Sequence, residues 1–443
     1  MNGLAHTRIM RAAFDSLPEN LRSAWKPFPD VIDVAGNYPD LFDNPSASEE
    51  AKRTVDPDWE RFCRFPETME ARSLHTWPHT IENQPAWQPV ILHWLREAIT
   101  SCRAGDTPSF IKWIGCLSHH EGDVTQPAHV LGLVSGMKLM EELLPKPPHL
   151  PNFNYHSDLE AVTGQVQLPL PPPRLLGTTA EEVAWRLCAL NTSAVKEMKR
   201  YVVPTLQAIF SGNEAEAERL AGPPVTLAAR LTQDILYTAL RLARADTPTE
   251  EREALQTLDL RLWPAMEEKH DLVYGGHAVL DGSLRIPPYP GPRVPAVLHT
   301  AEGTRPVPAL GVLPCSDLTG AREVWMRYDL PPGVFSRFQA LVGLHAELGA
   351  EGRVEFVVEL DGTEAWSSET RCGTDEALPV EVLLGKARSM RLLVRDRSEG
   401  CSFWQNHALW ASPRLVKDEK PTSQEAQSDA APGSPTSKIS LSL

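Results

Sequence analysis

The sequence lacks a long hydrophobic run, and it lacks an excess of positive charge. No stretch of the 443 residues approaches the roughly 18 apolar residues that cross a bilayer, so we expect no transmembrane segment. The 43 Lys and Arg residues against 58 Asp and Glu residues give a net charge of −15. This balance argues against binding of nucleic acid through a basic surface. A small anionic substrate is compatible with it, because bound metal ions can make the local charge positive.

The motifs of several common chemistries are also missing. The seven cysteines form no C-x-x-C pair. They are expected to be mostly buried thiols, with one or two disulfides if the protein is exported. There is no Walker loop or dinucleotide fingerprint, and segment 132–136 has its serine one position too late for a nucleophile elbow. The first residues carry no signal peptide. Either the protein stays in the cytoplasm or its true start lies upstream.

The patterns that are present divide the chain into two domains and a tail. Up to about residue 270, apolar residues recur at three- and four-residue spacing, which predicts helices. The predicted helices cover 87–104, 109–120, 127–144, 181–210 and 226–243. After about residue 272 the period becomes two, as in Val354–Leu360 followed by an Asp-Gly turn, which predicts strands. We predict an all-α domain over 1–270, an all-β sandwich over 272–417 and a disordered tail over 418–443.

The most informative segment runs from His119 to His129. His119 and Asp123 are four residues apart, so on a helix they share one face. Gly122 leaves room for close approach, and the Gln-Pro pair that follows redirects the chain before His129. Imidazole and carboxylate are the non-sulfur ligands that Zn²⁺ prefers.

A second pair of the same kind follows in the sequence. His156 and Glu160 are again a histidine and a carboxylate at i and i+4. A single such pair is usually a solvated surface contact worth a few tenths of a kcal/mol. Two pairs and an extra histidine exceed what one zinc ion needs, so the pattern favours a multinuclear metal site.

The pattern His119-x-x-Gly-Asp-x-x-Gln-Pro-x-His129 resembles the signature of the zinc-dependent phospholipase C and single-strand-specific nuclease superfamily. The resemblance implies a helical domain with a zinc cluster and metal-assisted hydrolysis of a phosphodiester. Nucleases of the superfamily typically show His-x-x-x-Asp downstream and phospholipases His-x-x-x-Glu. His156-x-x-x-Glu160 therefore favours the phospholipase branch.

The resemblance also implies a set of metal ligands by their order along the chain: His6, Asp40, His75, His119, Asp123, His129, His156 and Glu160, with His79 as an alternative to His75. One zinc would be held by Asp40, His75, His119 and Asp123, a second by His129, His156 and Glu160, and a third by His6 and the bridging Asp123. Asp40 would be the general base or purely a ligand.

One family feature is missing from this sequence. Family members are secreted, and an N-terminal Trp exposed by signal cleavage also binds the third zinc. No Trp precedes His6 here, so two to three zinc ions are expected.

The C-terminal region resembles the NPCBM family of carbohydrate-binding modules. The resemblance is carried by Val324–Leu330, Val354–Gly362 and the closing Asn406–Ala411, in which Asn406 and Leu409 replace aspartates. It implies a galactose-binding-like β-sandwich and a glycan partner. Trp366, Trp404 and Trp410 are more typical of core or edge aromatics than of sugar platforms.

These patterns favour the hypothesis that the protein is a zinc-dependent, phospholipase C-like phosphodiester hydrolase. Its substrate would be a phospholipid or another phosphodiester. A nuclease of the same superfamily is less favoured, because only Trp77 and Trp113 lie near the ligands in sequence as stacking platforms. A third hypothesis is a metal-binding adhesion protein that has lost catalysis because the N-terminal ligand is missing.

Overall fold

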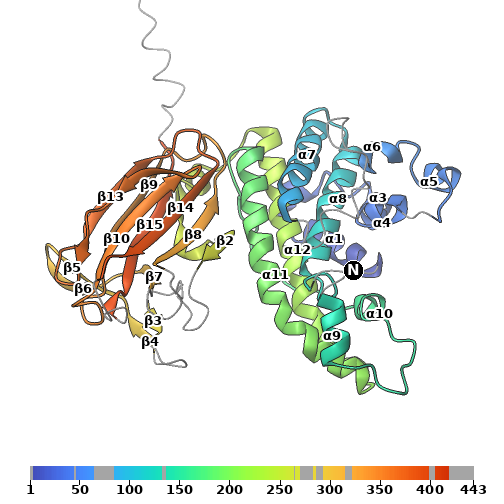
Figure 1. Cartoon of the computed structure of the whole chain (residues 1–443). Helices are drawn as coiled ribbons and strands as arrows, with labels where there is room; N and C mark the ends of the chain where they lie inside the picture. Colours follow the sequence, from blue (N-terminus) through green and yellow to red (C-terminus); the bar gives the residue numbers. More distant parts are fainter. Residues whose placement is uncertain are drawn as a thin grey trace, which may run out of the picture.

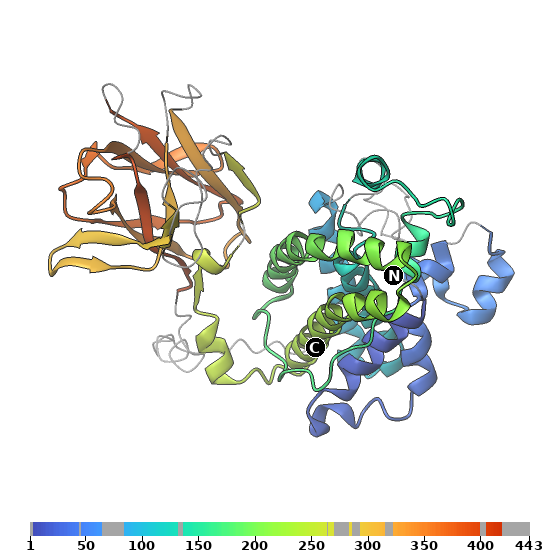
Figure 2. The ribbon, with the colours of Figure 1, turned by 90° about the horizontal axis from the view of Figure 1, so that it is seen from below.

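The computed structural model describes residues 3–43, 46–63, 84–131, 136–263, 265–269, 283–285, 293–314, 322–398 and 405–418. His75, His79, Trp77, Trp404 and the predicted tail beyond residue 418 lie outside these ranges. Within them, helices come first and strands second, and the two regions lie side by side (Figures 1 and 2). The predicted fold class, an all-α domain followed by an all-β sandwich, is confirmed. No helix among the described residues is both long and apolar enough to span a bilayer.

The helical region is built around α8, which is buried on every side. From Ser109 to Thr125 every residue except Lys112 is buried. Helix α8 packs against α1, α3, α7, α11 and α12, and the last two form the long antiparallel pair that faces the sandwich (Figure 1). The helices are α1 (Gly3–Asp15), α2 (Glu19–Arg22), α3 (Pro29–Ala35), α4 (Tyr38–Asp43), α5 (Glu49–Val55), α6 (Trp59–Cys63), α7 (Gln84–Arg103), α8 (Thr107–Thr125), α9 (Met137–Leu143), α10 (Ser157–Ala161), α11 (Ala180–Phe210), α12 (Glu214–Arg244) and α13 (Thr249–Ala254).

Two helix predictions need correction. The segment expected to be one helix over 127–144 begins with turns at 127–131, and α9 starts only at Met137. Helix α12 starts at Glu214, well before the expected residue 226, although Pro223 and Pro224 lie inside it. Proline normally breaks a helix. Here Leu220, Ala221 and Val225 around the two prolines are buried, so tertiary packing outweighs the local preference.

Two larger antiparallel sheets enclose the main apolar core of the sandwich, and β3-β4 and β5-β6 form two further two-stranded sheets among the described residues. The first sheet has the order β1-β15-β9-β13 with β7 paired to β15, and the second has the order β11-β10-β14-β8-β2 with β12 paired to β10. Asp361 and Gly362 connect β10 and β11 with φ values of +49° and +79°, as expected for the predicted hairpin turn.

The strands are β1 (Thr257–Asp259), β2 (Glu267–Lys269), β3 (Ser283–Arg285), β4 (Arg293–Pro295), β5 (Val297–Thr300), β6 (Gly303–Pro306), β7 (Ala309–Val312), β8 (Glu323–Asp329), β9 (Arg337–Leu344), β10 (Arg353–Leu360), β11 (Thr363–Ser367), β12 (Arg371–Cys372), β13 (Leu378–Leu383), β14 (Ser389–Asp396) and β15 (Ala408–Val416).

The sheets begin ahead of the boundary expected near residue 270. Strand β1 pairs with β15 and strand β2 pairs with β8, so both belong to the sandwich. Each has three residues, which is too short for an alternating pattern to be visible in the sequence.

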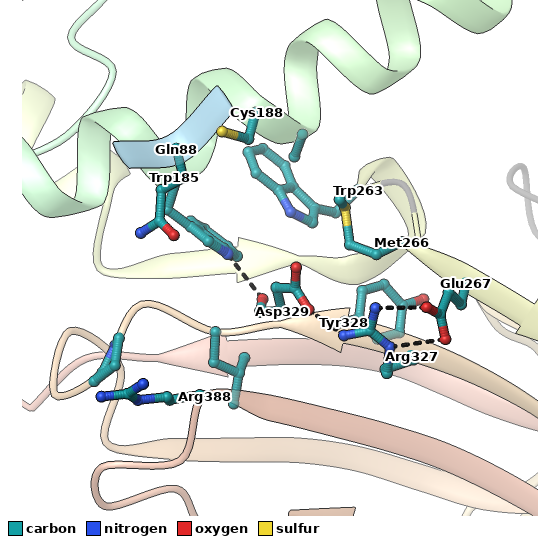
Figure 3. Close-up of a pocket in the computed structure, with 13 residues that line it drawn as sticks. Gln88, Trp185, Cys188, Trp263, Met266, Glu267, Arg327, Tyr328, Asp329 and Arg388 are labelled. Carbon is teal, nitrogen blue, oxygen red and sulfur yellow. Dashed lines mark hydrogen bonds and ion pairs between the residues drawn. The ribbon is translucent and has the colours of Figure 1, made fainter. Parts of the chain in front are cut away.

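The two regions share a contact surface on α11. Trp185 belongs to the same apolar cluster as the sandwich core, its Nε1 donates to the carbonyl oxygen of Asp329 at 2.8 Å, and its ring stacks on Trp263. A cavity of about 600 Å³ lies at this contact. Its lining includes Trp185 and Cys188 of α11 together with Trp263 and Tyr328, which are drawn in Figure 3. Arg327 on its wall is paired with Glu267 and Asp329.

Candidate metal centre

Helix α8 supplies the first two site residues from one face near its C-terminal end. His119 Nε2 and Asp123 Oδ2 are 3.1 Å apart, as the i,i+4 spacing predicts. The Nδ1 atom of His119 lies 2.9 Å from the carbonyl oxygen of Gly36, which follows α3. A carbonyl can only accept, so Nδ1 carries the proton and donates it. The lone pair of Nε2 is then directed toward Asp123, where a metal ion could be bound.

Helix α1 brings His6 against the same pair. The His6 ring is stacked on that of His119, with 4.0 Å between the ring centroids, and His6 Nε2 lies 3.5 Å from Asp123 Oδ1. A Cβ atom on Gly122 would lie 2.8 Å from the His6 ring. Only glycine therefore allows this approach, which agrees with the role expected for Gly122.

Asp40 completes the first group from the short helix α4. It lies in the first turn of this helix. Its Oδ1 atom is 3.6 Å from His119 Nε2, and its side chain is 38% exposed. One ligand atom from each of His6, Asp40 and His119 lies within 4.8 Å of the other two.

His129, His156 and Glu160 form a second group. Gln126 ends α8 with an extended backbone, which redirects the chain so that His129 follows in a turn. His129 Nε2 is 3.4 Å from Glu160 Oε1, and His156 Nδ1 is 3.6 Å from Glu160 Oε2. One ligand atom of each of the three lies within 4.8 Å of the other two.

Asp123 lies between the two groups. Its Oδ1 atom is 3.5 Å from His6 Nε2 and 3.9 Å from His129 Nε2. All expected ligands among the described residues therefore come together in one cluster. By distance, His6 lies in one group with Asp40 and His119, whereas the resemblance implies a separate ion for His6 and Asp123.

The protonation states of the cluster suit metal binding. Burial and the neighbouring His119 lower the pKa of His6 to about 4. Burial would raise the pKa of Glu160, but the hydrogen bond from His129 prevails and holds that pKa well below its usual range. At neutral pH the His6 imidazole is thus neutral and the Glu160 carboxyl ionised, the forms in which these groups bind metals.

Unsatisfied polar atoms also point to a metal. Both ring nitrogens of His6 and Nε2 of His156 are buried and have no hydrogen-bond partner among the described residues. Burying such groups unsatisfied costs free energy, and a bound cation would offset the cost. Histidine nitrogens with carboxylate oxygens form a donor set that fits zinc.

A second polar group, which sequence reasoning missed, lies behind the cluster. His120 and Glu121 of α8 and Asn191 of α11 are buried and joined by hydrogen bonds. Burial lowers the pKa of His120 to about 3 and raises that of Glu121 to about 8. Asn191 begins a formal glycosylation sequon, and nothing in the sequence shows that its side chain is buried against α8.

In the sandwich, the described residues that carried the resemblance contact other residues of the sandwich itself. Asn406 is buried, donates to Asp396 at 2.9 Å and accepts from the backbone of Arg353 at 2.9 Å. Trp410 is buried in the core and Trp366 packs against it, as expected for core aromatics.

The comparisons with known proteins identify the C-terminal module. Residues 318–416 match the model of the NPCBM/NEW2 domain. No curated protein matches the sequence. The alpha-toxin of Clostridium perfringens from avian strain SWCP is similar over 91% of this chain and 84% of its own, with 10% identity and a TM-score of 0.32. The alpha-toxin of Clostridium absonum is similar over 89% and 88%, with 12% identity and a TM-score of 0.32.

A solved carbohydrate-binding module also matches. The CBM51 module of Clostridium perfringens GH95, solved in complex with methyl-galactose, is similar over 36% of this chain and 99% of its own, with 16% identity and a TM-score of 0.28.

Proposed function

We propose that this protein is a zinc-dependent phosphodiester hydrolase of the phospholipase C type. The observation that carries the proposal is the pair of three-residue ligand groups with Asp123 between them. A catalytic helical domain followed by the sandwich belongs to the proposal, with β1 and β2 counted in the sandwich although they precede the limit expected near residue 270. Seven of the eight expected ligands lie in described residues, and all seven belong to this cluster: His6, Asp40, His119, Asp123, His129, His156 and Glu160.

Zinc at these residues would polarise the phosphate oxygens and lower the pKa of a bound water toward neutrality. His6, Asp40 and His119 would hold one ion and His129, His156 and Glu160 another, with Asp123 available to both. The three carboxylates alone would repel an anionic phosphodiester, so substrate binding at Asp40, Asp123 and Glu160 requires the charge of the metal.

The exposed residues of the cluster define where substrate enters. Asp40, His156 and Glu160 have side-chain exposures of 38%, 31% and 24%, whereas His6, His119, Asp123 and His129 are buried. Asp40 is therefore the carboxylate that solvent and substrate can reach most easily. We assign it the role of general base, which takes the proton of the attacking water.

The C-terminal module would bring the enzyme to its substrate. The match of 318–416 to the NPCBM/NEW2 model supports a glycan partner for this module. A phospholipid is the substrate that the His156-x-x-x-Glu160 pattern favours. Attachment to a glycan-bearing surface would raise the local concentration of such a substrate around the helical domain.

The test is zinc analysis by plasma mass spectrometry combined with hydrolysis assays. Purified protein is assayed with p-nitrophenyl phosphorylcholine, bis(p-nitrophenyl) phosphate and single-stranded DNA, before and after treatment with 1,10-phenanthroline. His119→Ala should abolish activity and lower the zinc content by one ion, while His149→Ala, at an exposed histidine, is the matched control. The proposal is supported if the protein contains two or three zinc ions per chain and hydrolyses the phosphorylcholine ester.

The other outcomes overturn the proposal in different ways. Faster hydrolysis of single-stranded DNA than of the two esters would favour a nuclease of the same superfamily. Bound zinc without hydrolysis of any of the three substrates would favour an adhesion protein. Absence of zinc would rule out the metal centre itself.

A further inference from the structure

The side of α8 that faces away from the metal ligands is held by one amide group from α11. The side chain of Asn191 is buried, and its Nδ2 atom lies 3.3 Å from His120 Nε2 and 3.1 Å from Glu121 Oε1. An amide nitrogen carries two hydrogens, so it can donate to both acceptors at once. Asn191 thus contacts the two residues that directly follow the proposed ligand His119.

Helix geometry makes this double contact sensitive to the rotation of α8. Consecutive side chains leave an α-helix about 100° apart. His120 and Glu121 therefore diverge, and one amide can bind both only at one rotational setting of the helix. Viewed down the helix axis, the mean direction of the His120 and Glu121 side chains is about 130° from the mean direction of His119 and Asp123. A rotation of α8 that displaced the ligand pair would break both hydrogen bonds.

The ligand side of α8 leaves no room for adjustment. A Cβ atom on Gly122 would lie 2.8 Å from the His6 ring, and one on Gly115 would lie 2.4 Å from the carbonyl oxygen of Ala35. Helices α1 and α3 therefore pack directly on the backbone of α8. With Asn191 on the opposite side, α8 is fixed from both directions.

Core packing alone does not account for these polar residues. Unpaired, a buried imidazole and a buried carboxyl both destabilise the fold relative to apolar side chains. Apolar residues such as Ile114 and Leu117 fill the remaining core positions of the same helix. Within the described part of the chain, His120 Nδ1 and Glu121 Oε2 have no hydrogen-bond partner, so the Asn191 amide is what satisfies each side chain. The Asn191 amide therefore links both side chains of α8 to α11.

We propose that Asn191 is a positioning residue for the metal centre. By fixing the rotation of α8, it sets the separation of His119 and Asp123 from His6, Asp40 and His129. It touches neither metal nor substrate, and it acts through His120 and Glu121. This inference rests on the proposed function, because it concerns the same metal cluster.

The test measures zinc affinity of the full-length protein by competition with a chromophoric chelator, and the visible spectrum of the Co²⁺-loaded protein. Asn191→Leu keeps the volume and removes both hydrogen bonds. It should weaken zinc binding about tenfold or more, the range seen when groups that orient metal ligands are lost, and it should alter the Co²⁺ spectrum. Thr205→Val is the control, because Thr205 is buried on the same helix and donates to the carbonyl oxygen of Tyr201.

A rescue variant separates positioning from mere stability. In Glu121→Gln combined with Asn191→Asp, the introduced amide donates to the introduced carboxylate, and His120 can donate from Nε2 after a change of tautomer. This double variant should recover most of the zinc affinity and the wild-type Co²⁺ spectrum. Thermal unfolding of the metal-free proteins reports how far each variant is destabilised.

The possible results separate the inference from the proposed function. Wild-type affinity and spectrum in Asn191→Leu, an equal loss in Thr205→Val, or no recovery in the double variant would each overturn the positioning role. Zinc binding and hydrolysis by the wild type would leave the proposed function intact in those cases. If the wild type itself binds no zinc, the proposed function fails first.

Discussion

Asp123 is the residue on which the proposed metal centre depends most. Its two oxygens lie between 3.1 and 3.9 Å from nitrogens of His6, His119 and His129, which come from α1, α8 and the turn after α8. Burial opposes its ionisation, but nearby positive charge outweighs burial and holds its pKa well below the usual range, with His119 and His129 among the groups that favour the ionised form. An ionised, buried carboxylate between three imidazoles can serve more than one cation.

Asp123→Ala should therefore remove more than one zinc ion per chain. The expected loss exceeds that of an ordinary ligand substitution, because the carboxylate contacts both ligand groups. Plasma mass spectrometry of the purified variant measures it, with Asp30→Ala, at an exposed aspartate, as the control. Full zinc retention in Asp123→Ala would contradict the shared role.

At the scale of elements, α8 determines both the packing and the site of the helical domain. It packs against helices on every side and carries buried polar residues on two of its sides, toward the proposed metal cluster and toward Asn191. Close approach of α1 depends on Gly122, which has no side chain to separate the two helices. Alanine has the higher helix propensity, but only glycine at this position allows the contact with His6.

Gly122→Ala should destabilise the protein more than Gly222→Ala. In α8 the added methyl group would overlap the His6 ring, so we expect a loss of about 1–3 kcal/mol and weaker zinc binding. In α12 the nearest atom to a new Cβ on Gly222 is 3.4 Å away, an ordinary contact. Gly222 also directly precedes Pro223, whose ring disfavours a helical backbone for a residue with a Cβ, so this cost offsets the usual gain of Gly→Ala and the net change should stay below about 1 kcal/mol.

Urea unfolding of both variants, followed by circular dichroism, provides the comparison. Equal effects of the two substitutions would show that the contact between Gly122 and His6 is not tight.

At the scale of the whole molecule, α11 connects the helical domain to the sandwich. Trp185 packs into the sandwich core, and Asn191, less than two turns further along, contacts α8. Beside them, Glu182 is paired with Arg186 on its own helix and with Lys417 at the end of β15, at 2.9 and 2.7 Å. A truncation near residue 270 would keep β1 and β2 without their partner strands and would expose Trp185, so the natural unit for folding experiments is the full chain.

Acid should weaken this connection through Glu182. Burial would raise the pKa of Glu182, but the charges of Arg186 and Lys417 outweigh it, and the folded-state pKa lies below the ordinary value. A depressed carboxyl pKa contributes stability that is fully present above the unfolded pKa of about 4.3 and is lost as the pH falls through the lower folded value. The contribution of the pair should thus be constant from pH 6 to about pH 5 and disappear in more acidic solution.

Urea unfolding of the wild type and of Lys417→Met at pH 6 and pH 3 measures this effect. Lys417→Met should destabilise the protein clearly at pH 6 and much less at pH 3, while Lys386→Met, at an exposed lysine, should have little effect at either pH. A pH-independent cost of Lys417→Met would contradict an electrostatic role for the pair.

Local patterns determined a large part of this protein. Periodicity identified the change from helices to strands, because the spacings of 3.6 and 2 follow from the backbone alone. The i,i+4 pair of His119 and Asp123 lies on one helical face for the same reason. The order of the remaining ligands came from the family signature.

Other features were decided only by tertiary structure, because they depend on which segments meet in space. Packing extends α12 through Pro223 and Pro224, and pairing with distant strands places β1 and β2 in the sandwich. The same holds for the grouping of His6 with Asp40 and His119, and for the contact of Asn191 with α8. In each case the partners are dozens of residues apart, so no local spacing in the sequence could indicate them.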